Sequence, residues 1–167
     1  MKKTCLTLIT VLMVLSILSI AAHAGPPTTA AGLWQYIPTI EDVRVANGNT
    51  FIHITEVGQW TGTFEGVSTE EGTVVRHSSG FVSFKGKVSF VGSVGDRSGT
   101  LEMRVVGEKP DQLPGTEWEG KWVILSGTDG LATLHGHGTW WGPGWNSAHP
   151  TEWGNINYSG KIHFDPE

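Results

Sequence analysis

From Leu33 onward the chain consists of short runs in which apolar and polar residues alternate, and no apolar repeat at helical spacing persists over three turns. Successive side chains of a β-strand point to opposite faces, so this alternation predicts strands. Glycine, asparagine, aspartate and proline separate the runs, as they do in turns. The predicted strands cover residues 33–37, 43–46, 50–57, 60–66, 73–77, 81–91, 99–106, 117–125, 131–141 and 156–164.

Five of these runs carry large apolar residues and glycine on one face and polar residues on the other. In the run 84–92, Phe84, Gly86, Val88 and Phe90 share one face, opposite lysine and serine. The same face of the other four runs holds Trp60, Gly62, Phe64 and Gly66; Trp118, Gly120, Trp122 and Ile124; Leu134, Gly136, Gly138 and Trp140; and Ile156, Tyr158, Gly160, Ile162 and Phe164.

A face that interleaves glycine with large side chains suits the inside of a small closed barrel. Glycine permits strongly coiled strands and leaves room for neighbouring rings. Closure also removes the exposed strand edges that a sheet would otherwise present. We therefore predict an all-β fold, a closed antiparallel barrel of about eight strands. A two-sheet β-sandwich is the alternative.

The first 24 residues have the layout of a secretory signal peptide. Two lysines precede an apolar run over 5–20, and an Ala-His-Ala sequence ending at Ala24 supplies a cleavage site. A transmembrane anchor is the alternative, for which the apolar run is short. We expect cleavage near Ala24, a flexible leader over 25–32, and a single barrel domain over 33–167 that is secreted or periplasmic.

Composition narrows the choice of partners. The chain has a net charge of −5, and loss of its two N-terminal lysines would make the remainder more acidic. No basic stripe runs along it, so nucleic acid is not an expected partner. We expect no membrane contact after cleavage and no disulfide, because the single cysteine, Cys5, lies in the signal segment. The oligomeric state is left open, with a homo-oligomer as one alternative.

Three histidines raise the question of a metal site. His135 and His137 share a strand face, and His163 would join them if the last two strands pair antiparallel. Imidazoles placed in this way are near enough to share a metal ion. This face is the polar, outward one, however, and no carboxylate alternates with the histidines along it. We therefore predict no metal and no cofactor.

Other candidate chemistry is weaker. Trp141, Trp145 and Trp153 lie on or beside the segment 142–155, where they could stack on a glycan or close one barrel mouth. Glu102 and Arg104 share a strand face and are expected to meet solvent as a charge pair. No nucleophile elbow or phosphate loop is present in the sequence, so no catalytic residue is assigned.

Several turn and strand motifs resemble those of a known family. They are Phe-x-Gly at Phe90, Gly-Asp-Arg-Ser-Gly at 95–99, Gly-Thr-Asp-Gly-Leu-Ala at 127–132 and Leu-His-Gly-His-Gly at 134–138. Over residues 50–140 the chain resembles an uncharacterised bacterial family of the allene oxide cyclase-like barrels. It departs from the family pattern at Asp96, where glycine is usual, and at the inserted Asp129.

The resemblance implies a barrel with an interior cavity. The wider group includes plant allene oxide cyclases and dirigent proteins, which bind apolar or phenolic molecules inside the barrel and steer their cyclisation or coupling. None of their catalytic acids, tyrosines or arginines is matched here.

We therefore expect this barrel to bind a small apolar or aromatic molecule, more in the manner of a binding protein than of an enzyme. An isomerase or cyclase of the allene oxide cyclase kind is one alternative, and it requires an ionisable side chain inside the cavity. A glycan-binding surface module is another. The expected ligand-binding residues are the large inward side chains Phe84, Phe90, Trp118, Trp122, Trp140 and Tyr158.

Overall fold

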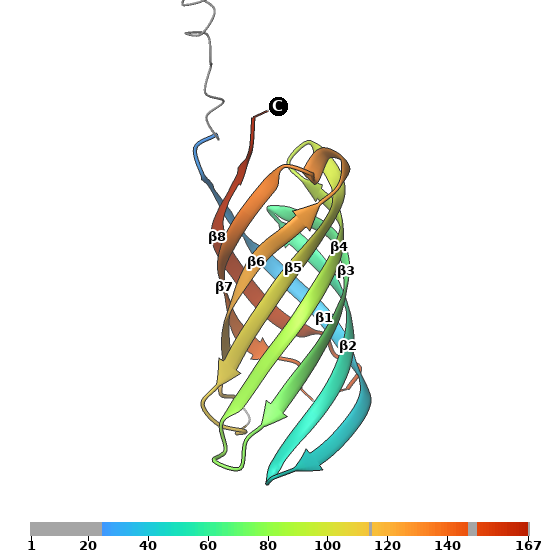
Figure 1. Cartoon of the computed structure of the whole chain (residues 1–167), viewed down its shortest axis with the longest axis vertical. Helices are drawn as coiled ribbons and strands as arrows, with labels where there is room; N and C mark the ends of the chain where they lie inside the picture. Colours follow the sequence, from blue (N-terminus) through green and yellow to red (C-terminus); the bar gives the residue numbers. More distant parts are fainter. Residues whose placement is uncertain (1–24, 114, 147–149, 167) are drawn as a thin grey trace, which may run out of the picture.

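The computed structural model describes residues 25–113, 115–146 and 150–166, and these form one closed antiparallel barrel (Figure 1). Each strand pairs with the next along the chain, and the last pairs with the first. The prediction of a closed barrel is confirmed, and the sandwich is excluded. The strands are β1 (Thr28–Ala46), β2 (Asn49–Gly62), β3 (Phe64–Arg76), β4 (Val82–Val94), β5 (Arg97–Lys109), β6 (Trp118–Gly127), β7 (Leu134–Gly144) and β8 (Gly154–Phe164), with the short 3-10 helix η1 (Asp129–Leu131) before β7.

The first strand is longer than the sequence predicts. The expected flexible leader over 25–32 is wrong from Thr28 onward, because Thr28 to Gly32 pair with β8 and complete the barrel. The two strands expected over 33–37 and 43–46 form one strand, with an irregularity in register between Ile40 and Asp42. The expected signal peptide, residues 1–24, lies outside the described residues.

The strand predicted over 60–66 is also wrong, because it contains a tight turn. β2 ends at Gly62, which has a φ of 102°, and β3 begins at Phe64. A φ in this region is readily adopted by glycine and rarely by other residues. Trp60 before the turn and Phe64 after it nevertheless point inward as predicted, since both side chains are buried in the core.

Glycines that face each other on neighbouring strands make room for aromatic rings. A Cβ atom on Gly138 or on Gly160, its partner on β8, would lie within 2.7 Å of the Trp122 indole. Three further glycine pairs have a ring over them in the same way. Trp140 lies over Gly107 and Gly120. Phe90 lies over Gly66 and Gly92, and Phe84 lies over Gly72 and Gly86. The alternation of glycine with large residues therefore reflects rings that lie against the barrel wall.

The two ends of the barrel differ. At the upper end in Figure 1, where the C-terminus lies, Phe64, Phe90, Leu101, Leu131 and Leu134 are fully or almost fully buried. Leu131 belongs to η1, which folds over this end. The lower end, where β1 turns into β2 and β3 into β4, contains a cavity. Below, we call these the filled end and the open end.

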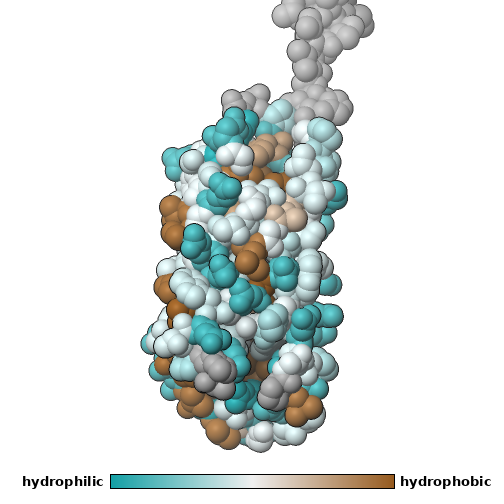
Figure 2. Space-filling view, turned by 180° about the vertical axis from the view of Figure 1, so that it is seen from behind, coloured by the Kyte–Doolittle hydropathy of each residue, from teal (hydrophilic) through white to brown (hydrophobic). Residues whose placement is uncertain are grey.

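The outer surface is mixed in character. In Figure 2, apolar side chains lie scattered among hydrophilic ones, as expected for the polar face of the alternation. Large apolar side chains at least half exposed include Val57, Val67 and Val91. No helix in the described ranges is long and apolar enough to cross a membrane.

Candidate functional site

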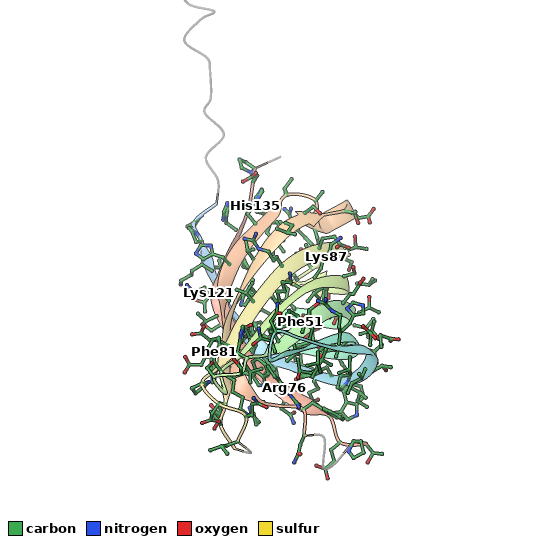
Figure 3. The ribbon with its side chains drawn as sticks, turned by 60° about the horizontal axis from the view of Figure 1, so that its bottom comes forward. Phe51, Arg76, Phe81, Lys87, Lys121 and His135 are labelled. Carbon is green, nitrogen blue, oxygen red and sulfur yellow. The ribbon has the colours of Figure 1, made fainter. Side chains whose placement is uncertain are left out.

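The open half of the barrel encloses a cavity of about 500 Å³. Side chains from all eight strands line it, together with residues of the segments that follow β5 and β7. This volume falls within the range of small-molecule sites in proteins. Arg76, which Figure 3 labels near the open end, and Lys109 lie among the lining residues.

Five of the six residues expected to bind a ligand line this cavity, and one does not. The five are Phe84, Trp118, Trp122, Trp140 and Tyr158. Phe90 is instead fully buried toward the filled end, where its ring lies 6.0 Å from that of Phe64 and 6.2 Å from that of Trp60. It shares the inward face of β4 with Phe84 but lies six residues further along the strand. Phe90 therefore does not line the cavity, whereas the other five expected residues do.

Three stacked rings form one wall of the cavity. Trp34 lies 4.4 Å from Tyr36 and 5.5 Å from Trp60, centroid to centroid, with interplanar angles of 17° and 22°. Trp34 and Trp60 are opposite each other on β1 and β2, and the Trp34 indole lies directly over Gly58. The Trp60 indole N–H donates a hydrogen bond to Ser68 Oγ at 2.8 Å, which fixes its orientation. We call Trp34, Tyr36 and Trp60 the aromatic wall.

Two carboxyl groups from neighbouring strands lie inside the cavity. Glu56 on β2 and Glu70 on β3 are partners in the strand register, and both line the cavity. Directly opposed residues have Cβ atoms about 4.5–5.5 Å apart. Only 6% of Glu56 and 2% of Glu70 is exposed. Neither carboxyl oxygen of Glu70 has a hydrogen-bond partner among the described residues. We call these two residues the carboxyl pair.

Neither glutamate is predicted as a site residue from the sequence, although a signal for both is present. The residues 67–72, rich in Ser, Thr and Glu, are not predicted as a strand, so their faces are not assigned. Continuing the inward alternation backward from Trp60 through Gly58 reaches Glu56. Continuing it forward from Gly66 through Ser68 reaches Glu70. An acidic residue that is an even number of positions from an inward-facing residue of the same strand is therefore predicted to point into the barrel.

Burial controls the protonation of this pair. Burial raises the pKa of Glu56 from 4.5 to about 8. Burial and then the charge of Glu56 raise the pKa of Glu70 well above 4.5. Burial also raises the pKa of Tyr36 beyond its ordinary value, so its hydroxyl stays neutral. The pair therefore holds at least one proton at neutral pH and can donate or accept it within the cavity.

The tryptophan-rich segment contributes to the mouth of the cavity. Trp145 lines the cavity, and its backbone N–H donates to the Tyr36 hydroxyl at 3.0 Å. Trp141 and Trp153 are 40% and 45% exposed and do not line it. The contact of Trp145 with Tyr36 favours closure of the mouth over a shared glycan-stacking surface.

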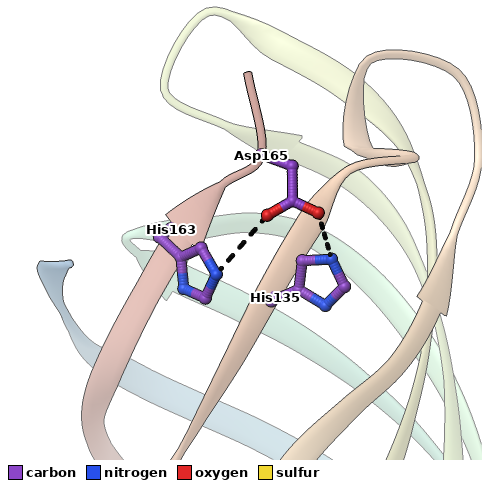
Figure 4. Close-up of polar contacts among 3 residues, drawn as sticks. All are labelled: His135, His163 and Asp165. Carbon is purple, nitrogen blue, oxygen red and sulfur yellow. Dashed lines mark hydrogen bonds and ion pairs between the residues drawn. The ribbon is translucent and has the colours of Figure 1, made fainter. Parts of the chain in front are cut away.

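The histidines lie outside the barrel at the filled end. His135 and His163 are register partners with stacked rings, and each Nε2 faces one oxygen of Asp165, at 3.0 Å and 3.7 Å (Figure 4). Asp165, just beyond β8, supplies a carboxylate that the strand alternation did not include. His137 is opposite Lys161 instead. No group of three or more His, Cys, Asp or Glu side chains within the described residues could hold a metal ion.

Glu102 forms its ion pair with a different partner from the one considered in the sequence. Its Oε2 lies 2.6 Å from Nζ of Lys87 on the neighbouring strand, and Ser89 donates to its Oε1. The hydrogen bond from Lys87 lowers the pKa of this carboxyl. Arg104 is exposed and opposite Lys87 in the register. This pair lies on the outer face and has no part in the cavity.

The fold and site define a class of protein: a closed antiparallel barrel with one filled end and one hollow end that holds buried carboxyl groups. The chain belongs to the DUF3224 family of proteins of unknown function, whose model matches residues 35–142. It is similar to the crystal structure of a DUF3224 family protein of unknown function from Shewanella oneidensis MR-1. The two share 16% sequence identity with a TM-score of 0.66, over 85% of this chain and 100% of the other.

These comparisons bear on the fold and on family membership. No curated protein matches the sequence. At 16% identity the structural likeness shows the fold alone. The expected resemblance to an uncharacterised bacterial family is thus supported at the level of DUF3224, and its grouping with the allene oxide cyclase-like barrels stays a prediction.

Proposed function

We propose that this protein binds a small apolar or aromatic molecule in the open half of its barrel. The observation that carries the proposal is the cavity of about 500 Å³ in a barrel that is otherwise tightly packed. A barrel of about eight strands can be filled by its own side chains, so a hollow half lined by aromatic and aliphatic residues is space that a small ligand can occupy. The signal-peptide layout of residues 1–24 supports action after export, in the periplasm or outside the cell.

Partly filling the cavity should weaken ligand binding. Val74 lines the cavity from β3, whereas its neighbour Val75 does not. A panel of fatty acids, phenolics and terpenoids, followed by tryptophan fluorescence, should contain ligands that change the emission of the aromatic wall. We expect Val74→Phe to weaken binding of any such ligand by at least about tenfold, or about 1.4 kcal/mol. Val75→Phe should leave binding unchanged. The proposal fails if no member of the panel changes the fluorescence, or if both variants bind like the wild type.

A second candidate, an isomerase or cyclase of the allene oxide cyclase kind, is favoured by the carboxyl pair. Such a reaction rearranges the bonds of one substrate and needs no co-reactant. A buried protonated carboxyl can donate a proton while its partner accepts one. With unsaturated epoxides as substrates, Glu56→Gln and Glu70→Gln should retain binding and lose turnover by at least about a hundredfold. Wild-type protein that binds the epoxides but does not convert them would leave binding as the function.

A further inference from the structure

We infer that the cavity contains a subsite for an ammonium group: the carboxyl pair and the aromatic wall together bind a protonated amine carried by an apolar or aromatic molecule. This inference rests on the proposed function and adds the chemical class of the ligand to it. Three features support the inference: the buried carboxyl of Glu70 without a hydrogen-bond partner, the position of Glu56 opposite it in the strand register, and the aromatic rings nearby.

Nothing in the described part of the protein neutralises the carboxyl pair. Buried carboxyl groups are normally hydrogen-bonded or paired with a cation, because burial of an unpaired polar group is costly. Both oxygens of Glu70 lack a partner, and no described lysine or arginine lies within ion-pair distance of Glu56 or Glu70. Arg76 lines the cavity on the same strand, but it is exposed and six residues beyond Glu70, or about 20 Å.

The opposition of two carboxyls favours a cation over a neutral ligand. A ligand hydroxyl has a single O–H donor, so once the pair is deprotonated the hydroxyl can donate to only one of the two carboxylates. An ammonium group carries three N–H donors and a positive charge, so it can bond to both carboxyls at once. Binding such a group would supply the partners that Glu70 lacks in the free protein.

The aromatic wall extends this preference. Glu56, Gly58 and Trp60 follow one another on the inward face of β2, and the Trp34 indole lies over Gly58. The indole of Trp34 therefore lies between the carboxyl pair and Trp60. The ring of an aromatic amine held at the carboxyl pair would pack against this wall. An apolar body beyond the ammonium group would meet the aliphatic and aromatic side chains of the rest of the cavity.

The pH dependence of ligand affinity distinguishes an ammonium subsite from binding by apolar contacts alone. The pair is protonated in the free protein at neutral pH, so an ammonium ligand must displace a proton as it binds, and its affinity should rise from pH 6 to pH 8. The other titratable groups that line the cavity are Tyr36, Arg76, Lys109 and Tyr158. Burial raises the pKa of both tyrosines, so they stay neutral over this range.

Three probes of one shape test the inference: naphthylmethylamine, naphthylmethanol and naphthoate, titrated by calorimetry into the whole protein. At pH 8 we expect the amine to bind at least about tenfold more tightly than the alcohol. The preference should shrink at pH 6 and disappear in Glu56→Gln/Glu70→Gln. Glu71→Gln, the outward neighbour of Glu70, should bind like the wild type. If the double variant does not fold, the single variant Glu56→Gln takes its place, with a reduced preference expected.

The outcomes separate the inference from the proposed function. An alcohol or naphthoate that binds as tightly as the amine overturns the ammonium subsite and leaves small-molecule binding intact. An amine preference that persists in the glutamine variants also overturns it. If no probe binds, and the broader panel also leaves the fluorescence unchanged, the proposed function itself fails.

Discussion

Replacing Glu56 and Glu70 by glutamine should stabilise the barrel at pH 8 by several kcal/mol and have a much smaller effect at pH 5. Burial raises the pKa of Glu56 from 4.5 to about 8, and it raises that of Glu70 as well. The folded state therefore keeps protons that the unfolded chain releases above pH 4.5. Wild-type stability from these groups is fully present below pH 4.5, falls as pH rises, and is lost above about pH 8.

The size of this effect follows from proton linkage. One unit of pKa difference is worth about 1.4 kcal/mol, so Glu56 alone accounts for an upper value on the order of 5 kcal/mol between the two pH limits. A glutamine amide and a protonated carboxyl are both neutral and of similar size, so the variant and the wild type should be nearly equal below pH 4.5 and differ by about 1–2 kcal/mol at pH 5.

Urea denaturation at pH 5, 6.5 and 8 measures the difference. Glu71→Gln, on the outer face of β3, is the matched control; its exposed contact with His53 is worth less than about 1 kcal/mol, so this variant should stay within that margin of the wild type at every pH. Curves for the double variant that run parallel to those of the wild type would show that the two carboxyls titrate as they do in water, against the buried pair described here.

Gly138→Val should prevent the barrel from folding. A Cβ atom at this position would lie 2.0 Å from the backbone oxygen of Ser159 and 2.6 Å from the Cα of Gly160. It would also lie 2.7 Å from the indole of Trp122. Backbone atoms of a paired strand cannot move aside without loss of the ladder. We expect a cost above the 1–3 kcal/mol typical of overpacked cores, about 4 kcal/mol or more, which is a large share of a small domain's stability.

Thr139→Val is the control for this substitution. Thr139 is the next residue of β7, is exposed, and is already β-branched. It should change the free energy of unfolding by less than about 0.5 kcal/mol. Circular dichroism and thermal unfolding of the two variants provide the comparison. A cooperative unfolding transition for Gly138→Val near that of the wild type would mean that ring packing does not require this glycine pair.

The closed barrel could be predicted because its evidence is local. The alternation of large apolar residues with glycine in Phe84, Gly86, Val88 and Phe90 can be read from one strand alone, and four other runs of the sequence show it too. The Asn-Gly turn at Asn47 and Gly48 is likewise local, and both residues have the positive φ that this hairpin turn requires. Such features need no knowledge of which strands are neighbours.

The depth of the cavity could not be predicted in this way. Phe84 and Phe90 share a face of β4, and only the other strands decide that the first lines a cavity and the second is enclosed by Phe64 and Trp60. The filling of that end also depends on Leu131, which comes from the connection before β7. The volume of the cavity depends on the side chains of all eight strands together, so no single strand predicts it.

The carboxyl pair was missed for a different reason. An acidic residue within a polar run normally faces solvent, so Glu70 gives no reason by itself to expect burial. Its inward direction follows from the register of β3, and its partner Glu56 follows from the pairing of β2 with β3. The two glutamates indicate a site only when both are known to lie on the inward face of neighbouring strands.

The most direct measurement is an NMR titration of the glutamate side-chain carboxyl carbons in labelled protein, assigned with Glu56→Gln and Glu70→Gln. We expect two resonances with midpoints well above 4.5, one of them near 8. Removal of Glu56 should lower the midpoint of Glu70, because the two groups titrate as a pair. Midpoints near 4.5 for every glutamate would contradict a cavity that holds two opposed, buried carboxyl groups.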